Sequence, residues 1–299
     1  MSFLPESILV LGSGGLLGRH VVSEYAKFDR PIFALTHNEL DVTDEKALVA
    51  IFEKIKPQVI INCAALCNFQ RCEDFPELSA EVNQDAPIQM ARLAAQRGIK
   101  LVHFSTDYIF DGKLQTPYSE VDMPHPLSVY GTHKAAVEAA FQSFPEHLLL
   151  RVAWLFGTGG KTFLSLLPDL LMQRETVEVA SGKRGSCLHA GYAGHLIRQL
   201  IDRGASGLYN LVHSGETSWE GFARECLRQL MDRGYQPLCR NLIEVPLDKM
   251  TVLSGSRPIY SVLDVSRLSQ KMDDPLLDWQ AGLSEFLDGV YPVQRVVLA

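Results

Sequence analysis

The sequence predicts an α/β fold, a doubly wound parallel sheet with helices on both faces and a smaller C-terminal substrate lobe. Short apolar runs alternate with amphipathic segments as far as Ala153. The runs are uninterrupted, as expected of parallel strands that are buried on both faces. Beyond Trp154 this alternation weakens, which indicates the less regular lobe.

The first half of the chain alternates expected strands and helices. The apolar runs that we expect to be strands are residues 8–11, 31–35, 59–63, 100–105 and 148–153. Helices are expected at 16–28, from a cap at Thr43 or Asp44 to Pro57, at 77–96 and at 127–144. Pro87 should kink or break the third of these helices.

The second half is less regular. Pro168 should interrupt a helical stretch, Gly182 and Gly185 flank a basic turn, and residues 207–212 resemble a strand. Amphipathic helices are expected at 219–233 and 276–290. We therefore divide the chain into a dinucleotide-binding domain (1–155) and a substrate-binding lobe (156–299), with segments near 187–213 returning to the first domain.

Composition excludes several classes of protein. The net charge of −7 and the lack of a basic run argue against nucleic-acid binding. No apolar stretch approaches the roughly 18 to 20 residues of a membrane span, and Met1–Glu6 lacks the features of a secretory signal. Cys63, Cys67 and Cys72 lack the C-x-x-C spacing of zinc sites, so we expect reduced thiols in a cytoplasmic protein.

A glycine-rich loop follows the first apolar run. Gly12, Gly15 and Gly18 are spaced three residues apart, where the first helix should begin. Small residues let the backbone approach a pyrophosphate, and a helix N-terminus supplies free N–H groups and positive potential. The spacing departs from G-x-G-x-x-G, and a purely structural turn is the alternative. The position after the first strand favours a Rossmann-type dinucleotide site.

Tyr130 and Lys134 form the most informative pair. Positions i and i+4 share one face of a helix, so the ammonium can lie beside the phenol and a bound ribose. A nearby cation favours the phenolate and should lower the pKa of Tyr130, as acid–base catalysis at a carbonyl requires. A chance pair on a solvated face is the alternative.

A polar stretch, Ser105 to Gly112, ends another buried strand. Ligands of such sheets lie beyond the carboxyl ends of the strands. A hydroxyl there, facing the same crevice as Tyr130, can hydrogen-bond a substrate oxygen and polarise it. The alternative is a turn whose polar side chains only satisfy the backbone.

Together these motifs resemble the extended short-chain dehydrogenase/reductases. The resemblance rests on Gly12-x-x-Gly15-x-x-Gly18, Asn62-Cys-Ala-Ala65, Ser105-Thr106 and Tyr130-x-x-x-Lys134. More narrowly, the chain is similar to the dTDP-4-dehydrorhamnose reductases over almost its whole length. The stretches that carry this likeness are residues 39–44, 82–83, 104–112, 151–157 and 257–264.

The resemblance implies a cofactor site. The implied residues are Gly12, Gly15, Leu16, Leu17 and Gly18 at the pyrophosphate, Asp41 and Val42 at the adenine, and Ala64, Ala65 and Leu66 along the crevice.

The resemblance also implies a reaction. Hydride passes from the nicotinamide to C4 of a nucleotide-linked 4-keto-6-deoxy sugar, and Tyr130 donates a proton to the reduced carbonyl. Lys134 binds the nicotinamide ribose and tunes Tyr130, while Thr106 orients the keto oxygen. The residues that border the sugar are Asp107, Tyr108 and Trp154.

The chain departs from the family pattern at Ser181–Cys187. Relatives usually carry Asp-Gln-x-Gly-x-Pro-Thr there, and this chain has Ser-Gly-Lys-Arg-Gly-Ser-Cys, which keeps Gly185. Lys183 and Arg184 can bind a diphosphate, and an exposed basic turn is the alternative. The identity of the nucleotide sugar is therefore left open.

A second departure concerns the cofactor. His37 stands where relatives often have an arginine, which favours a 2′-phosphate. No acidic residue within Thr36–Asn38 demands a free 2′-hydroxyl, so we expect NADPH, with NADH as the alternative. We expect no metal ion, because the magnesium site of some relatives has no acidic counterpart near Leu16.

Two other functions stay open at this point. One is a related nucleotide-sugar epimerase or dehydratase, although dehydratases carry more acidic residues beside the catalytic hydroxyl than Asp107 alone. The other is a regulatory subunit like that of methionine adenosyltransferase, which binds NADP and which an intact Tyr130/Lys134 pair does not exclude. Proteins of this kind are often symmetric homodimers, but the sequence reveals no self-complementary patch.

Overall fold

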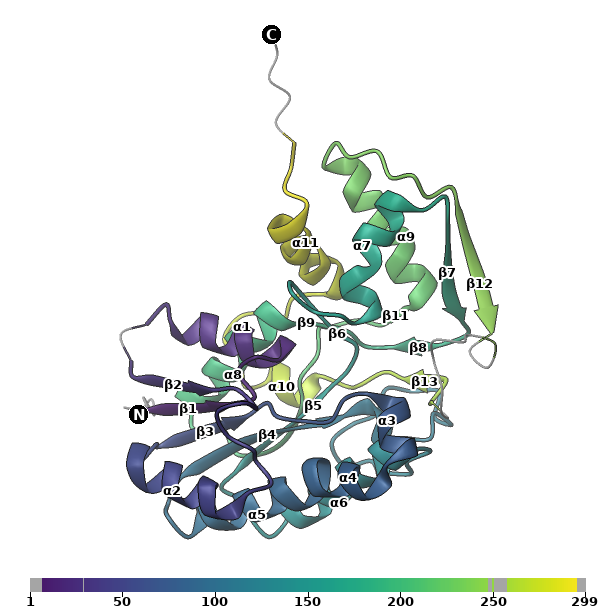
Figure 1. Cartoon of the computed structure of the whole chain (residues 1–299). Coiled ribbons are helices and arrows are strands. Elements are labelled where there is room, and N and C mark those ends of the chain that lie inside the picture. The colour runs from purple at the N-terminus through teal and green to yellow at the C-terminus, as the bar shows by residue number, and fades with distance from the viewer. Residues whose placement is uncertain (1–6, 29, 247–248, 250–256, 295–299) are drawn as a thin grey trace.

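A parallel sheet of six strands forms the centre of the computed structural model, which describes residues 7–28, 30–246, 249 and 257–294 (Figure 1). Its order is β10-β5-β4-β3-β1-β2, and every neighbouring pair is parallel. The strands are β1 (Ile8–Leu11), β2 (Ile32–Leu35), β3 (Val59–Asn62), β4 (Lys100–Thr106), β5 (Leu148–Val152) and β10 (Gly207–Asn210). The predicted doubly wound α/β fold is confirmed.

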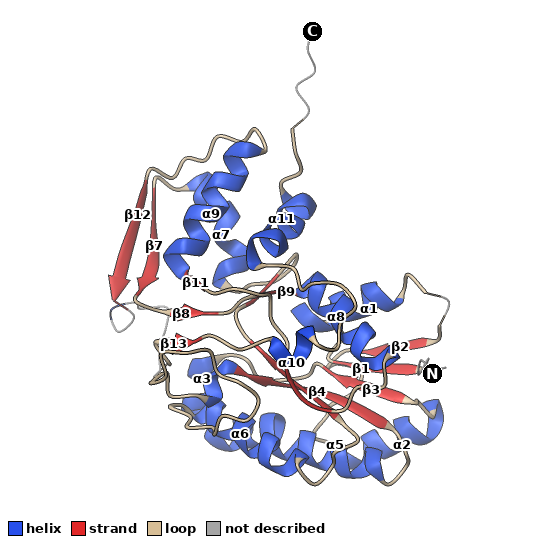
Figure 2. Cartoon of the chain, turned by 180° about the vertical axis from the view of Figure 1, so that it is seen from behind, coloured by secondary structure: helices blue, strands red, loops and turns tan. Residues whose placement is uncertain are grey.

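Helices cover both faces of this sheet (Figure 2). Side chains alternate along β1, so Ile8 and Val10 pack in one core while Leu9 and Leu11 pack in the opposite one. The first core includes side chains of α1 (Leu16–Tyr25) and α8 (Ala190–Asp202). The second includes side chains of α2 (Glu45–Ile55), α5 (Ala86–Ala95) and α6 (Val129–Phe141). Burial on both faces explains why apolar residues predominate in the strands and show no polar alternation in β1.

The helix predicted at 77–96, with a kink or break at Pro87, is confirmed as a run of consecutive helical elements, and a short helix that was not predicted, α3 (Phe69–Asp74), precedes it. The run contains α4 (Pro76–Ala80) and a π-helical turn, η1 (Glu81–Asp85), that leads into α5. Pro87 lies in the first turn of α5, where its missing N–H does no harm. In a regular helix the proline ring would meet the carbonyl four residues earlier, and the wider π turn relieves that clash.

The second lobe has a core of its own. Helices α7 (Phe163–Gln173), α9 (Trp219–Asp232) and α11 (Trp279–Val290) pack around Phe156 and Phe286. The helices flank a parallel pair, β7 (Thr176–Ser181) and β12 (Asn241–Pro246), in the upper part of Figure 1. Strand β12 was not predicted, and Pro168 lies inside α7 instead of interrupting it.

Short strands connect the two regions. Strand β8 (Arg184–Gly185) pairs with β11 (Thr217–Ser218) and with β13 (Tyr260–Ser261), while β6 (Leu155–Phe156) pairs with β9 (Leu188–His189). The remaining elements are η2 (Asp107–Ile109) and α10 (Ser266–Ser269). After β9 the chain returns to the central sheet, because α8 packs on α1 and β10 pairs with β5. Among the described helices, none is long and apolar enough to cross a membrane.

Candidate active site

The glycine loop follows β1 and lies next to the end of β3, the neighbouring strand in the sheet. The strand order of the sheet reverses between these two strands. Gly12 has a φ of +71°, and a Cβ atom there would lie 2.6 Å from the backbone N of Ala64. A Cβ on Gly18 would lie 2.3 Å from the carbonyl oxygen of Gly12. These two glycines are therefore needed to fold the loop against β3 and α1.

Gly15 differs from these two glycines because it is exposed at the start of α1. A Cβ there would come no closer than 3.3 Å to its nearest neighbour, the oxygen of Gly12. Gly15 is the N-cap of α1, and no side chain accepts a hydrogen bond from the first turn. The backbone N–H groups of Leu16 and Leu17, in the first turn of α1, are therefore suited to donate hydrogen bonds to the pyrophosphate of a dinucleotide.

The predicted adenine side lies after β2. His37 and Asp41 are exposed and Val42 is buried. The Asp41 carboxylate accepts hydrogen bonds from the backbone N and the hydroxyl of Thr43, which lower its pKa. An acidic residue that the prediction did not weigh, Glu39, accepts two hydrogen bonds from Thr36 and is held at the end of β2.

The crevice segment Ala64–Leu66 is fixed from both ends. The Asn62 side chain accepts a hydrogen bond from Ala64 N at 3.1 Å. The amide of Asn83, within the π turn, accepts from Leu66 N at 2.9 Å and donates to Leu66 O at 3.0 Å. The π turn thus positions Asn83, whose side chain fixes the backbone of Leu66 beside the crevice. This role was not predicted from the sequence.

Lys134 lies one turn after Tyr130 on α6 and is 2% exposed. Its Nζ donates to the carbonyl oxygen of Phe104 at 2.9 Å and lies 3.4 Å from Nε2 of His103. It also lies 6.0 Å from the centre of the Tyr130 ring. Burial lowers the pKa of Lys134 to about 8.

The pKa of Tyr130 differs in direction from the prediction. Burial raises it well above its ordinary value, and the nearby thiols of Cys67 and Cys72 and the Asp107 carboxylate raise it further. The prediction was wrong because it counted the Lys134 cation and left out desolvation of the phenolate. The phenol is therefore held protonated, which is the state that can donate a proton.

Thr106 and Asp107 continue from the end of β4. The hydroxyl of Thr106 donates to Oδ1 of Asp107 at 3.2 Å and accepts from Tyr108 N at 3.2 Å. Its one proton is thus directed at Asp107 and must turn to reach a substrate oxygen. Oδ2 of Asp107 accepts from the hydroxyl of Ser261 on β13 at 2.7 Å, so the second lobe fixes this carboxylate.

Aromatic rings form one side of the site. Tyr108 lies edge-on to Phe69 and to Tyr130, with ring centres 5.1 and 6.5 Å apart. Trp154 packs on the backbone of Gly185, where a Cβ would come within 2.7 Å of the indole. The structure thus brings the predicted residues Thr106, Asp107, Tyr108 and Tyr130 together and explains why Gly185 is needed.

The two basic residues Lys183 and Arg184 lie in different environments. Arg184 has a side chain that is 55% exposed and forms an ion pair with Glu216. Lys183 is 1% exposed, and its Nζ lies 4.8 Å from the ring centre of Tyr108 and 5.7 Å from that of Trp154. The alternative prediction of an exposed basic turn is therefore wrong for Lys183, which is buried, and confirmed for Arg184, which is exposed.

Arg257 is a further cation that sequence reasoning did not place in the site. Its guanidinium lies 4.8 Å from the ring centre of Phe69. Its Nε and Nη1 atoms are buried and have no hydrogen-bond partner among the described residues. Unpaired donors of this kind suit an anionic ligand.

A network of buried charges supports the site from behind. Glu138, on α6, accepts from the hydroxyl of Ser105 at 2.5 Å and from two nitrogens of Arg151 at 2.9 and 2.7 Å. Arg151, on β5, also donates to the carbonyl oxygen of Ser119 at 2.9 Å. The network ties β4, β5 and α6 together next to Thr106 and Lys134.

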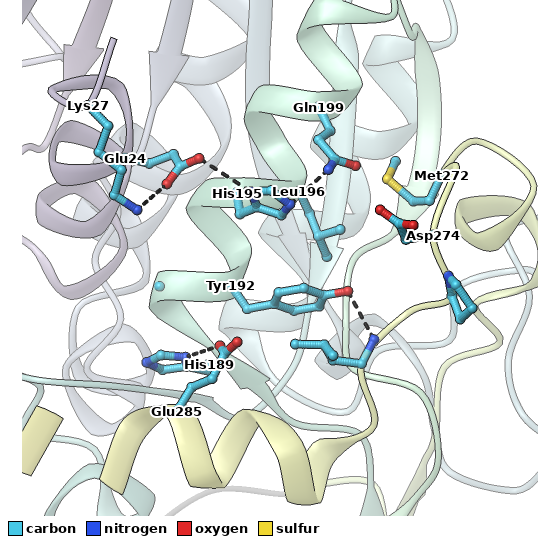
Figure 3. Close-up of a pocket in the computed structure, with 13 residues that line it drawn as sticks. Glu24, Lys27, His189, Tyr192, His195, Leu196, Gln199, Met272, Asp274 and Glu285 are labelled. Carbon is cyan, nitrogen blue, oxygen red and sulfur yellow. Dashed lines mark hydrogen bonds and ion pairs between the residues drawn. The ribbon is translucent and has the colours of Figure 1, made fainter. Parts of the chain in front are cut away.

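A cavity of about 540 Å³ lies elsewhere, between α1, α8 and the segment before α11 (Figure 3). The polar side chains there largely pair with one another, as Glu24 does with Lys27 and His189 with Glu285. None of the predicted site residues lines it. Within the described residues, no group of three or more His, Cys, Asp or Glu side chains is arranged to hold a metal ion.

The parallel sheet, the glycine loop at its reversal point and the Tyr130/Lys134 pair define an NAD(P)-dependent oxidoreductase of the extended short-chain dehydrogenase/reductase class. Sequence comparison narrows this class. The sequence model of the RmlD substrate binding domain matches residues 6–291, and the chain belongs to this family.

Named relatives agree with this assignment. The chain is 33% identical to a dTDP-4-keto-6-deoxy-D-glucose reductase of Streptomyces niveus over 72% of this chain and 76% of that one. It is 29% identical to the dTDP-4-dehydrorhamnose reductase of Salmonella typhimurium over 97% of this chain and 100% of that one. The crystal structure of a dTDP-4-dehydrorhamnose reductase from Bacillus anthracis in complex with NADP has a TM-score of 0.88 and 25% identity, covering 96% of this chain and 100% of that chain.

Proposed function

We propose that this protein uses NADPH to reduce the C4 ketone of a dTDP-linked 4-keto-6-deoxy sugar to an alcohol. The observation that carries the proposal is the convergence of Thr106, Asp107 and Tyr130 at one end of the sheet that also presents the glycine loop. Relatives named as reductases of dTDP-linked keto sugars support the substrate class, and a relative bound to NADP supports the cofactor.

Tyr130 is the proton donor in this proposal. Reduction of a ketone places negative charge on its oxygen, and a phenol within hydrogen-bond reach can neutralise that charge. Burial raises the pKa of Tyr130, so the phenol is protonated at neutral pH and ready to donate. When bound, NADPH supplies the hydride.

Lys134 and Thr106 orient the reactants. The Lys134 ammonium is held by the carbonyl oxygen of Phe104, and its remaining protons suit the hydroxyls of a ribose. The Thr106 hydroxyl turns its proton from Asp107 to the keto oxygen, which adds a second donor beside Tyr130.

Arg257 binds the diphosphate of the nucleotide sugar in this proposal. Its buried Nε and Nη1 have no partner among the described residues, and a phosphate offers the bidentate acceptor that a guanidinium prefers. The neighbouring ring of Phe69 holds the guanidinium plane from one side.

The proposed place of action is the cytoplasm. The six cysteines are free thiols, as expected under reducing conditions. The oligomeric state, for which a homodimer was considered, stays a prediction.

The test is a cofactor-oxidation assay with a panel of dTDP-linked 4-keto-6-deoxy sugars, run with NADPH and NADH side by side. Tyr130→Phe should reduce kcat by at least about 100-fold and leave NADPH binding within about twofold. Tyr235→Phe, in the second lobe, is the matched control and should keep full activity. Cofactor binding without turnover of any sugar, together with a tightly bound partner enzyme, would instead indicate a regulatory subunit.

A further inference from the structure

A buried ammonium lies beside the proposed sugar site and has no part in the steps above. Lys183 stands between β7 and β8, within the stretch where the chain departs from the family pattern, and is 1% exposed. Lysine is almost never fully buried unless its charge is compensated. The question is which group in the site compensates it.

The direct contacts of Lys183 leave part of its capacity unused. Its Nζ donates to the carbonyl oxygen of Pro258 at 3.1 Å, which occupies one of three protons. The faces of Tyr108 and Trp154 lie 4.8 and 5.7 Å away, where a cation is attracted by the ring electrons. None of these three groups carries a formal negative charge.

Asp107 is the buried carboxylate whose charge acts on Lys183. It is 2% exposed, and no ion pair joins it directly to a described cation. Burial raises the pKa of Asp107, and the Lys183 charge is the largest influence that lowers it. In turn, the pKa of Lys183 is lowered by burial to about 8, and the charge of Asp107 opposes that fall.

Other titratable groups around the pair do not replace Lys183. Arg257 is a like charge that lowers the pKa of Lys183, and it acts on Tyr108. Tyr108 and Tyr130 face Asp107, and the carboxylate raises the pKa of both phenols. Loss of the Lys183 charge should therefore raise the pKa of Asp107 more than loss of the Arg257 charge would.

An ionised Asp107 has unused acceptor capacity. A carboxylate offers about four lone-pair sites; the hydroxyl of Ser261 occupies one, and that of Thr106 occupies another until it turns to the keto oxygen. The remaining sites can accept hydrogen bonds from hydroxyl groups of a sugar. A protonated Asp107 would present a donor and lose part of this capacity.

We propose that Lys183 is a positioning residue of the sugar site: its buried ammonium, held by the carbonyl oxygen of Pro258, lies behind the rings of Tyr108 and Trp154 and supports Asp107 as an acceptor for sugar hydroxyls. This inference rests on the proposed function, because it takes a keto sugar as the ligand that Asp107 contacts. It concerns a position where the family pattern, aligned on Gly185, has a glutamine and this chain has a lysine.

The first experiment separates charge from structure. Lys183→Met should raise KM for the keto sugar at least about 10-fold, lower kcat less, and leave the Kd of NADPH within about twofold. The acidic limb of kcat/KM should move upward by about one pH unit or more, because Asp107 then protonates more readily. Lys183→Arg, which keeps the charge, should restore the position of that limb even if KM stays raised. Lys113→Met, at a lysine with an 84% exposed side chain, is the matched control and should match wild type.

The second experiment is a double-mutant cycle with Asp107→Asn. If Lys183 acts through the Asp107 charge, Lys183→Met should change KM by less than about threefold in the Asp107→Asn background. The same cycle read by urea unfolding should show coupling between the two sites without any substrate. That readout tests the charge pair even if the wild-type protein reduces no keto sugar, a result that would sink the proposed function alone.

Three results would overturn the inference. One is a Lys183→Met enzyme with wild-type KM and pH profile. Another is full additivity of Lys183→Met and Asp107→Asn in both readouts. The third is an equal loss of NADPH and sugar binding that Lys183→Arg shares, since a merely structural role predicts it.

Discussion

Arg151→Met removes the cation from the buried network behind the site. Arg151 donates to Glu138 at 2.9 and 2.7 Å and to the carbonyl oxygen of Ser119 at 2.9 Å. Methionine keeps much of the aliphatic packing but makes none of these bonds, and it lacks the guanidinium that lies 5.0 Å from the ring centre of Phe110. The Glu138 carboxylate, 7% exposed, would keep only the hydroxyl of Ser105 as a partner.

Removing one member of a buried ion pair costs about 3–5 kcal/mol, because it leaves the other charge buried and unpaired. Three hydrogen bonds to Arg151 are lost in addition to the charge, so we expect a value in the upper half of that range. With a urea dependence of about 3 kcal/mol per M, the unfolding midpoint should fall by about 1 M or more. Since a domain is stable by about 5–15 kcal/mol, the variant should still fold.

The assay is urea unfolding followed by circular dichroism, with Arg228→Met as the matched control. Arg228 also forms two ion pairs, with Glu225 and Asp232, but its side chain is 57% exposed. Its loss should leave the midpoint unchanged, because exposed pairs contribute little. A double variant that also replaces Glu138 by Met should regain part of the lost stability. A fall of less than about 0.3 M for Arg151→Met would refute the reasoning.

Three further predictions concern the cofactor side. Gly15→Ala should fold normally and weaken NADPH binding at least about 10-fold in a fluorescence titration, whereas Gly18→Ala, with a Cβ 2.3 Å from a backbone oxygen, should reduce the yield of folded protein. Asn83→Ala should raise KM for NADPH with little change in kcat and cost about 1–3 kcal/mol in urea unfolding, because Leu66 loses both of its hydrogen bonds to the Asn83 side chain and keeps only the weak bond from the Cys72 thiol to its carbonyl oxygen among the side-chain bonds of the described residues. Burial lowers the pKa of Lys134 from 10.5 to about 8, so the unfolded chain binds more protons than the folded chain between these pH values. The free energy of unfolding should therefore rise from pH 8 to pH 10. Urea unfolding curves at the two pH values should show that Lys134→Met removes the part of this rise that Lys134 contributes.

Local patterns were sufficient to predict the strands of the sheet and the placement of Tyr130 and Lys134 on one helix. The strands β1 and β3 are apolar runs of strand length, and α6 starts where Ser128 accepts a hydrogen bond from Gly131 N. Helical periodicity then puts Tyr130 and Lys134 on one face, which needs no knowledge of distant contacts. The same reasoning located the glycine loop, since its strand and helix are adjacent in the chain.

Long-range contacts explain what the sequence could not predict. Lys183 lies between Gly182 and Arg184, both exposed, and no periodicity marks it as buried. Its burial follows from the pairing of β8 with β13, two strands of two residues each. The π turn that carries Asn83 arises from Pro87 in a helix that the sequence predicts as merely broken. The direction of the Tyr130 pKa likewise depends on desolvation, which requires the packed structure.

The two departures from the family pattern, at His37 and at Lys183, affect different parts of the protein. His37 is exposed, so a histidine in place of an arginine changes the surface at the proposed adenine side and leaves the fold untouched. Lys183 is buried beside Asp107, Tyr108 and Trp154, so a change there alters the charge of the sugar site itself. A buried ammonium persists only where a partner offsets its desolvation, and Asp107 with two aromatic faces provides that partner. We therefore expect substitutions in the segment between β7 and β8 to change binding of the sugar in this chain.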